Sequence, residues 1–324
     1  MQKNTYMHDK QPLISFILPA YKGHFLKESI KSILNQTYIH FELVIVNDCS
    51  PEDIRSIVLS YNDEHIRYYE NEKNIGAKDL VANWNHCLQY AQGEWAVMAS
   101  DDDVYAPEFA SEMIRLVEKY PEVNLVHSRL QVIDAQGRQT AVSEPSIERE
   151  SAEEFIFQNI VKRRKQVAPN FMFRLSAMKG IGGFVNFPMA WGSDDATWCK
   201  LALTCEGVGY SSQALFSWRY SGENISSLRS NLFDKAKTRI LFATYFEKEI
   251  LPFLKKEGEA ISAYYGYLSC ALIPSTIKQE LMNIIINSGS VRLLTKVARD
   301  KEVRAFLGKD LIRKMVVRFC YVKL

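Results

Sequence analysis

The sequence lacks several features that would assign a class of protein at once. No apolar run approaches the roughly 18 to 20 residues that a membrane-spanning helix requires. No GxGxxG fingerprint follows the first predicted strand and no Walker lysine motif occurs, which disfavours a nicotinamide dehydrogenase. The six cysteines show neither CxxC spacing nor paired histidines, so we interpret them as reduced cytosolic thiols rather than metal ligands.

Neither strong charge nor an amino-terminal leader is apparent. The formal net charge is +2 in 324 residues, so the composition does not call for a nucleic-acid partner. Residues 1–11 are polar and lack the apolar core of a signal peptide. We therefore expect a chain that begins in the cytoplasm, whose only contact with a membrane would be peripheral, at the inner face.

Short apolar runs alternate with segments of helical periodicity. Predicted strands cover 13–18, 41–46, 66–69, 95–99 and 171–175, and predicted helices cover 25–36, 51–61, 76–91, 107–119, 151–165 and 196–205. Residues 123–132 alternate apolar with polar and precede a turn at 134–137, which predicts a hairpin. The alternation predicts an α/β fold with a doubly wound, mainly parallel sheet.

Length and pattern predict two units. Beyond about residue 230, strand signals give way to long helical patterns, so we expect an α/β domain at 1–228 and a helical segment at 229–324. One predicted helix near the end has apolar and basic faces; its residues are Leu311, Ile312, Met315, Val316, Phe319 and Cys320 against Lys309, Arg313, Lys314 and Arg318. Such a helix either lies on an anionic membrane or packs on its own domain with the basic face in water.

Three adjacent carboxylates follow the predicted strand 95–99. Asp101, Asp102 and Asp103 repel one another unless they splay into solvent or a cation lies among them. Hard oxygen ligands of this kind suit Mg²⁺ or Mn²⁺, especially when substrate phosphates complete the coordination. The alternative is a solvated acidic turn whose last residue caps a helix that opens near Pro107.

Asp48 also follows a predicted strand. In doubly wound sheets, ligands bind beyond the carboxyl ends of the strands, at the point where the strand order reverses. Asp48 and the acidic triplet are therefore expected to meet at one crevice. This convergence favours a functional role for the triplet.

A second acidic pair, Asp194 and Asp195, begins a predicted helix. Acidic residues in a first turn are favoured by the helix dipole, and Ser193 is a good capping residue, so the pair has a structural explanation. Neighbouring glycines and an aromatic, Trp191, make it a functional candidate as well. Arg219, between aromatics, either contacts a phosphate or stacks on surface rings.

Several ordered motifs closely resemble those of family-two glycosyltransferases, which have a GT-A fold. The resemblance covers residues 13 to about 226 and rests on Ser15-Phe-Ile-Leu-Pro-Ala-Tyr21, Ser32-Ile-Leu-Asn-Gln-Thr37-Tyr, Glu42-Leu-Val-Ile-Val-Asn-Asp48-Cys-Ser50, Asn74-Ile-Gly76, Ala91-Gln-Gly93-Glu94 and Ser100-Asp-Asp-Asp103 with Pro107. It implies inverting transfer of a sugar from a nucleotide diphosphate donor, commonly UDP-linked, with Mn²⁺ or Mg²⁺. It also implies a glycan or surface polysaccharide as the acceptor.

The resemblance assigns roles by position. The nucleotide pocket would be lined by Pro19, Ala20 and Tyr21, with Asp48 accepting from the base and Asp101 near the ribose. The metal would be bound principally by Asp102, with Asp103 beside it. The general base would be Asp195, with Asp194 as the other member of the pair, because a carboxylate in hydrogen-bond reach can take the proton of the attacking hydroxyl.

The sequence departs from the family pattern at three places. Ser100 stands where many members have an acid two residues before the metal ligand. Trp84 replaces a frequent arginine, which leaves Lys78 as the nearby cation for a phosphate. Ser221 stands near a position that often holds histidine, so a histidine metal ligand is not expected there.

Two other functions share features with this sequence. A nucleotidyltransferase also uses a doubly wound sheet with acidic metal sites, but its glycine-rich basic loop is poorly matched by Pro19-Ala-Tyr-Lys-Gly23. A non-enzymatic module that binds a nucleotide sugar without transferring it is compatible with the departures at Ser100 and Trp84.

Overall fold

The computed structural model describes residues 11–160, 164–222, 232–254 and 290–308, together with 278–279, 282–283, 285–286, 288 and 312. The predicted basic helix at 309–320 thus lies outside the described residues except at Ile312, as do Cys270 and Cys320. The four described cysteines are free thiols, and burial raises the pKa of the Cys87 thiol to about 12. Within the described ranges, no helix has the length and apolar character needed to span a membrane.

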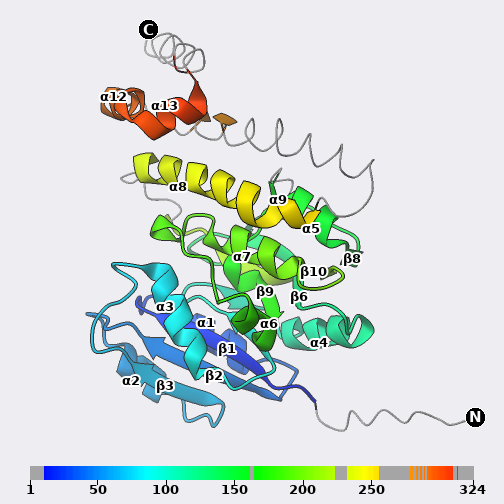
Figure 1. Ribbon diagram of the computed structural model, residues 1–324. Helices are drawn as coiled ribbons and strands as arrows, with labels where there is room; N and C mark the ends of the chain where they lie inside the picture. Colours follow the sequence, from blue (N-terminus) through cyan, green and yellow to red (C-terminus); the bar gives the residue numbers. More distant parts are fainter. Residues whose placement is uncertain are drawn as a thin grey trace, which may run out of the picture.

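A mixed sheet forms the centre of the molecule (Figure 1). Its strands are β1 (Ile14–Ala20), β2 (Phe41–Asn47), β3 (Ile66–Glu70), β4 (Trp95–Met98), β5 (Val104–Tyr105), β6 (Leu125–Ile133), β7 (Gln139–Val142), β8 (Arg149–Glu150), β9 (Phe171–Arg174) and β10 (Val208–Arg219). The order is β3-β2-β1-β4-β9-β6-β10-β5, with β7 on β6 and β8 on β10. The strands β1 to β4, β6 and β10 share one direction, and the remaining four oppose them. The predicted α/β fold with a mainly parallel sheet is confirmed.

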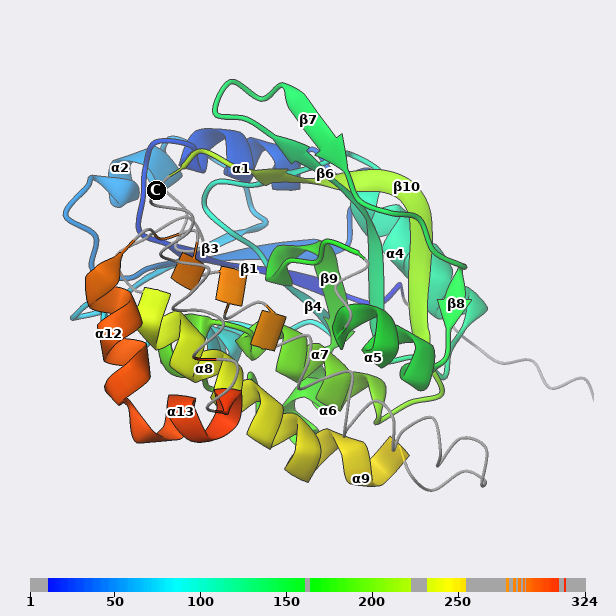
Figure 2. The ribbon, with the colours of Figure 1, turned by 90° about the horizontal axis from the view of Figure 1, so that it is seen from above.

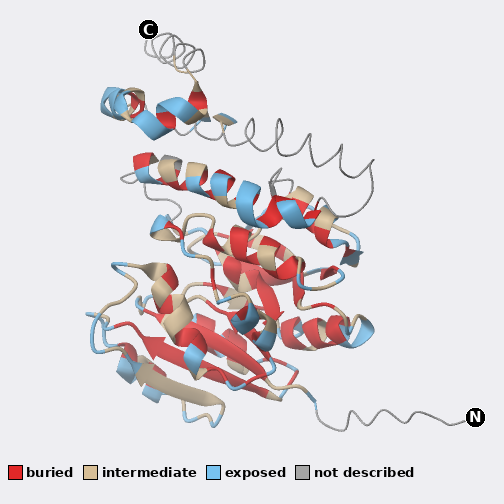
Figure 3. Cartoon of the chain, viewed as in Figure 1, coloured by how far each residue is buried: buried red, intermediate tan, exposed pale blue. Residues whose placement is uncertain are grey.

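Helices cover both faces of this sheet. They are α1 (Leu26–Leu34), α2 (Ile54–Leu59), α3 (Leu80–Cys87), α4 (Phe109–Lys119), α5 (Ala152–Ile160), α6 (Leu175–Gly180), α7 (Ser193–Ala202), α8 (Leu232–Tyr245), α9 (Leu251–Leu254), α12 (Val291–Arg299) and α13 (Lys301–Leu307). Alternate side chains of the central strands enter two hydrophobic clusters. Ile17 and Met98 join one with α3 and α5 to α8, whereas Phe16 and Val97 join the other with α1, α2 and α4. Because both faces are covered, the central strands are buried and read as continuous apolar runs (Figure 3).

The helices beyond residue 231 pack on the α/β part. Phe242 and Phe246 belong to the same hydrophobic cluster as Phe187 and Trp198. In Figure 1, α8 lies above α7, and α12 and α13 lie on the side of α8 that faces away from α7. The domain boundary near residue 228, between β10 and α8, stays a prediction.

Several predicted element boundaries are wrong, and local hydrogen bonds explain the clearest cases. The helix expected from Pro51 begins at Ile54, because Asp53 caps it by accepting from the N–H of Ser56 at 3.0 Å. The helix expected from Gly76 begins at Leu80, because Asp79 caps it through the N–H of Ala82 at 2.9 Å. The short helix α6 and the strand β5 were not predicted.

Neither acidic site has the helix cap that the sequence suggested, although Asp194 and Asp195 do occupy the first turn of α7 as expected. The helix expected near Pro107 begins at Phe109 after Glu108, and Asp103 does not cap it. Gly192, in the left-handed region at φ 79°, is the N-cap of α7. The Ser193 hydroxyl instead accepts from the N–H of Phe187 at 3.0 Å, which ties down the preceding loop.

Candidate functional site

A pocket of about 1150 Å³ opens at the carboxyl ends of β1, β2 and β4. The strand order reverses at β1, which has β2 on one side and β4 on the other, so the loops after these strands diverge and leave a crevice. Most of the predicted site residues line it: Pro19, Ala20, Tyr21, Asp48, Asp101, Asp102, Asp103, Asp194 and Asp195. The expected meeting of Asp48 with the acidic triplet is confirmed as geometry; the chemical role of each residue stays a prediction.

Asp48 holds the loop that follows β3. Its Oδ1 accepts from the Ile75 N–H at 2.9 Å and from Asn71 Nδ2 at 2.7 Å, and its Oδ2 accepts from the Gly76 N–H at 2.7 Å. A Cβ on Gly76 would lie 2.8 Å from Oδ2, so only glycine allows this approach. The carboxylate is 3 % exposed and still lines the pocket, where any contact with a nucleobase would use its remaining acceptor capacity.

Asp101 holds the loop after β1 in the same way. Its Oδ2 accepts from the backbone N–H groups of Tyr21 at 2.9 Å and Lys22 at 2.8 Å. Burial, opposed by these bonds and reinforced by the neighbouring Asp102, raises the Asp101 pKa to about 6. The predicted nucleotide loop is thereby attached to the acidic turn.

Asp103 and Arg219 form a buried anchor beneath the pocket. Asp103 Oδ1 accepts from the Arg219 N–H at 2.8 Å, and burial raises the Asp103 pKa well above its usual range. The Arg219 guanidinium donates to the Asp102 carbonyl at 2.8 Å, pairs with Glu28 at 2.6 Å and stacks on Phe25 at 4.3 Å. Arg219 lies outside the pocket lining and is 1 % exposed, so of its two predicted roles only ring stacking occurs, on the half-buried Phe25. The same side chain also braces the acidic turn.

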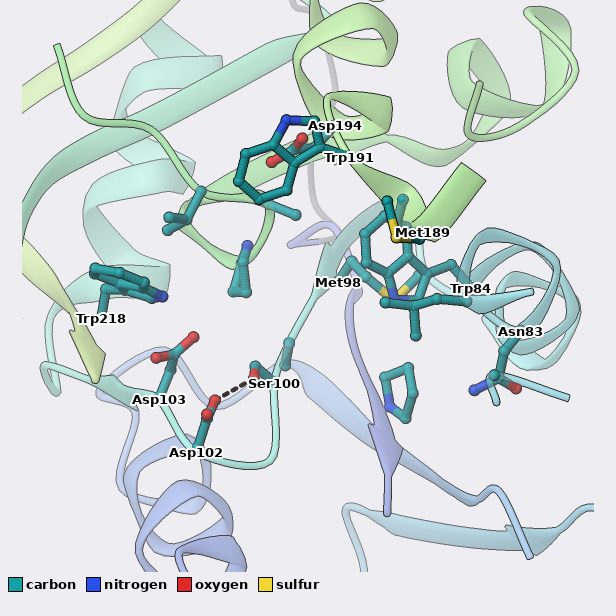
Figure 4. Close-up of a pocket in the computed structure, with 18 of the residues that line it drawn as sticks. Asn83, Trp84, Met98, Ser100, Asp102, Asp103, Met189, Trp191, Asp194 and Trp218 are labelled. Carbon is teal, nitrogen blue, oxygen red and sulfur yellow. Dashed lines mark hydrogen bonds between the residues drawn. The ribbon is translucent and has the colours of Figure 1, made fainter. Parts of the chain in front are cut away.

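Asp102 lies between the two anchored carboxylates of Asp101 and Asp103 and lines the pocket. Its Oδ1 accepts from Ser100 Oγ at 2.5 Å, and Figure 4 shows this bond at the floor of the pocket. Among the described residues, no three acidic, histidine or cysteine side chains converge to hold a metal by protein atoms alone. This donor set fits Mg²⁺ or Mn²⁺ bound by one or two carboxylates and completed by substrate phosphates, the usual arrangement for Mg²⁺.

Asp194 lies across the pocket from Asp102 and Asp103 (Figure 4), and Asp195 lines the same pocket. Asp194 and Asp195 occupy the first turn of α7. Asn159 of α5 donates through Nδ2 to Asp195 Oδ1 at 3.2 Å and to Gln166 Oε1 at 2.8 Å. The carboxylate of Asp195 is thus oriented by a neutral amide.

Aromatic and thioether side chains form part of the remaining walls. Trp84, Met98 and Met189 gather on one side, while Trp218 and Trp191 stand at the other (Figure 4). Lys165 Nζ lies 4.0 Å from the Trp218 ring. Trp191, expected as an exposed aromatic, is half-buried in the pocket wall.

Some residues were placed wrongly or missed. Lys78, predicted to meet a phosphate, is exposed and does not line the pocket. Asn159, Gln166 and Arg239 line the pocket without having been predicted, because each lies in a segment with no motif. The one available signal was an amide, Asn159, at a position within an otherwise apolar helix face.

The profile of glycosyl transferase family 2 matches residues 15–182, slightly more than half of the chain. An uncharacterized glycosyltransferase of Rickettsia typhi is 32 % identical over 127 residues, which cover 39 % of this chain and 37 % of that protein. A putative colanic acid biosynthesis glycosyl transferase of Escherichia coli, WcaA, is 38 % identical over 99 residues, covering 30 % and 34 %. The chain thus matches less than half the length of these curated relatives.

Solved structures of low sequence identity share the fold. Staphylococcus aureus TarS 1–349 in complex with UDP-GlcNAc superposes with a TM-score of 0.66 at 19 % identity, covering 96 % of this chain and 91 % of that one. The mannosyltransferase PcManGT from Pyrobaculum calidifontis, in complex with GDP-Man and Mn²⁺, gives 0.55 at 16 % identity, covering 96 % and 87 %. At these identities the likeness shows the fold alone, and it includes the helical segment beyond the family match.

Replacing Asp48 is expected to destabilise the fold. Asp48→Ala leaves two backbone N–H groups and an amide without their buried acceptor, which should lower the free energy of unfolding by about 1–3 kcal/mol. Urea denaturation followed by circular dichroism measures the loss. Asp53→Ala, which removes an exposed helix cap, is the control and should cost less; equal losses in the two variants would contradict the anchoring role.

Proposed function

The chain belongs to glycosyl transferase family 2, and from that premise we propose that it is an inverting, metal-dependent glycosyltransferase. The donor is a nucleoside diphosphate sugar, with UDP as the nucleoside diphosphate, and the acceptor is a hydroxyl of a growing glycan or polysaccharide. One observation carries this proposal: the strand-end carboxylates and the acidic pair of α7 face each other across one pocket. Family membership favours sugar transfer over the nucleotidyltransferase alternative.

The donor half of the proposed site is formed by the loops after β1, β2 and β4. Pro19, Ala20 and Tyr21 line the nucleotide side, Asp48 accepts from the base and Asp101 lies near the ribose. Asp102, with Asp103 beside it, holds Mn²⁺ or Mg²⁺ together with the donor's diphosphate. The metal, when bound, supplies positive charge against the charge that grows on the leaving diphosphate.

Asp195 is the proposed general base. The acceptor oxygen forms its bond to the anomeric carbon on the face opposite the diphosphate, while the bond from that carbon to the diphosphate oxygen breaks and leaves its electron pair on oxygen. The Asp195 carboxylate takes the hydroxyl proton as the new bond forms. Asn159 keeps the carboxylate oriented through its bond to Oδ1, and the flanking tryptophans exclude water.

The names of the solved structures and of the sequence relatives support the proposed donor and acceptor. UDP-GlcNAc and GDP-Man occupy the neighbours of the same fold, which supports a nucleoside diphosphate sugar. Colanic acid biosynthesis, in the name of the Escherichia coli relative, supports a polysaccharide acceptor. A panel of UDP- and GDP-sugars separates the two nucleotides.

Asp195→Asn should greatly reduce sugar transfer without weakening the binding of the donor. The amide has the shape of the carboxylate but cannot take a proton, so turnover should fall about 10²–10⁴-fold. Donor consumption across the sugar panel, with saccharide acceptors, measures turnover, and isothermal titration measures donor affinity. Asp134→Asn, in an exposed turn, is the control. Retained turnover in Asp195→Asn would rule out this base, and donor binding with no turnover in the unmodified protein would favour the non-enzymatic module.

Asp102→Ala should remove the effect of metal on nucleotide binding. In the unmodified protein, Mn²⁺ should tighten UDP binding, because Asp102 would hold the ion and the ion would supply positive charge to the diphosphate. For Asp102→Ala, titrations with UDP in the presence and absence of EDTA should give the same affinity. Ser100→Ala, which loses only the hydroxyl that donates to Asp102, keeps the carboxylate and should keep the metal effect. A metal effect of full size in Asp102→Ala would contradict the assignment.

Peripheral contact with an anionic membrane is proposed for the carboxyl-terminal part. On α12 and α13, Arg292, Arg299, Lys301 and Arg304 are exposed. Their acidic neighbours, Asp300 and Glu302, are already paired with Lys237 of α8 at 3.4 and 3.1 Å, so the outer face is cationic.

Vesicle sedimentation tests this contact. Each basic residue near an anionic surface contributes about 1 kcal/mol, so changing Arg292 and Arg299 to Gln should weaken binding to phosphatidylglycerol vesicles at least tenfold. Arg55→Gln, an exposed arginine on the distant helix α2, is the control. Equal binding to phosphatidylcholine vesicles, or no loss in the double variant, would refute the electrostatic contact.

A further inference from the structure

The loop that leads into α7 has an unusual backbone. Met189 and Ala190 adopt φ angles of 59° and 56°, and Gly192 follows at 79°, all in the left-handed region. Residues with a Cβ adopt this conformation only when their surroundings impose it. Met189, Ala190 and Gly192 also line the pocket, immediately before Asp194 and Asp195. The conformation of this loop therefore needs a restraint from outside it.

One face of α8 supplies contacts along the whole loop. The residues concerned are Lys235, Thr238, Arg239 and Phe242, whose spacing of three, four and seven places them on one side of the helix. All four are buried, at 3, 0, 4 and 1 % exposure. Figure 2 shows α8 running beside α7, so this face is turned toward the loop.

The contacts are specific at each end of the loop. At its start, Thr238 Oγ1, which donates to the Asp234 carbonyl at 2.9 Å, also lies 3.4 Å from the Pro188 carbonyl oxygen. The Phe242 ring packs on the Phe187 ring with centroids 6.1 Å apart. At its end, Lys235 Nζ lies 4.4 Å from the Trp191 ring.

Arg239 lies next to Gly192, the N-cap of α7. A Cβ on Gly192 would lie 3.2 Å from Arg239 Nη1, so the guanidinium closes directly over that glycine. Arg239 also stacks on Phe242 at 4.5 Å, which holds its long side chain in place. A cation is buried only where other groups compensate its charge, which makes its removal costly to the local arrangement.

We propose that α8, through Arg239 and Lys235, positions the acidic pair. The two side chains hold the left-handed loop so that the first turn of α7 presents Asp194 and Asp195 to the pocket. They are positioning residues, because they act on the loop and α7 rather than on the reacting atoms. This inference rests on the proposed function of Asp195. It adds that sugar transfer depends on the helical segment, whereas donor binding depends on the loops after β1, β2 and β4.

The first test requires no activity. Hydrogen–deuterium exchange of the full chain without ligand should show faster exchange at 187–195 in Arg239→Met, which keeps much of the side chain's volume but loses the guanidinium. Leu241→Ala, on the same helix but 47 % exposed, is the matched control and should leave this exchange unchanged. Unchanged exchange at 187–195 in Arg239→Met would overturn the proposal.

The second test uses turnover. Arg239→Met should lower kcat at least tenfold, because small displacements of a catalytic group have large effects, while the KM for the donor stays within twofold. Arg239→Lys, which keeps the charge, should restore part of kcat. A rise in donor KM that matches the fall in kcat would overturn the proposal. If Arg239→Met does not fold, as judged by circular dichroism, Lys235→Met is measured under the same criteria.

A matched pair of glycine variants separates loop strain from the contact with α8. Gly192 and Gly137 have φ angles of 79° and 78°, but a Cβ on Gly137 would meet nothing within 4 Å. Gly192→Ala should therefore lower kcat and Gly137→Ala should not, although both strain the backbone equally. If the unmodified chain transfers no sugar, the proposed function fails, and the exchange experiment still decides whether α8 holds the loop.

Discussion

The pocket depends on carboxylates that bind backbone N–H groups of neighbouring loops. Asp48 holds the loop at Ile75 and Gly76, Asp101 holds the loop at Tyr21 and Lys22, and Asp103 holds the end of β10 at Arg219. Such charge-assisted bonds are stronger than neutral ones. Parallel strands end together at one edge of the sheet, where their loops would otherwise move independently. The same acidic residues that suggest a ligand site therefore also build its walls.

This arrangement explains how three adjacent carboxylates are tolerated. Asp101 and Asp103 each accept from backbone N–H groups, which stabilise the carboxylate charge, whereas burial raises the pKa of both. Asp102 lies between them and faces the pocket. These donors offset part of the repulsion expected from the sequence, and Asp102 stays the predicted metal ligand.

The two sides of the pocket come from different parts of the chain. The family profile ends at residue 182, whereas the acidic pair of α7 and its support from α8 lie beyond it. The side of the pocket formed by the strand ends could therefore be predicted from sequence motifs. The opposite side, with Asn159, Trp191 and Arg239, comes from segments without motifs, and their nearness to the pocket follows only from packing in the cluster that joins α5, α7 and α8.

The sequence alone determined β1 to β4, the mainly parallel sheet and the position of the strand-end acids, because buried strands require continuous apolar runs and parallel strands end at one edge. It did not reveal β5, β8 or β10. It misplaced the starts of α2 and α3, because several residues near each start could cap and only the folded geometry selects Asp53 and Asp79. Only the tertiary structure decided that Arg219 braces the acidic turn and that α8 covers the loop before Asp194. Those contacts join residues far apart in sequence, and no local propensity encodes a distance between them.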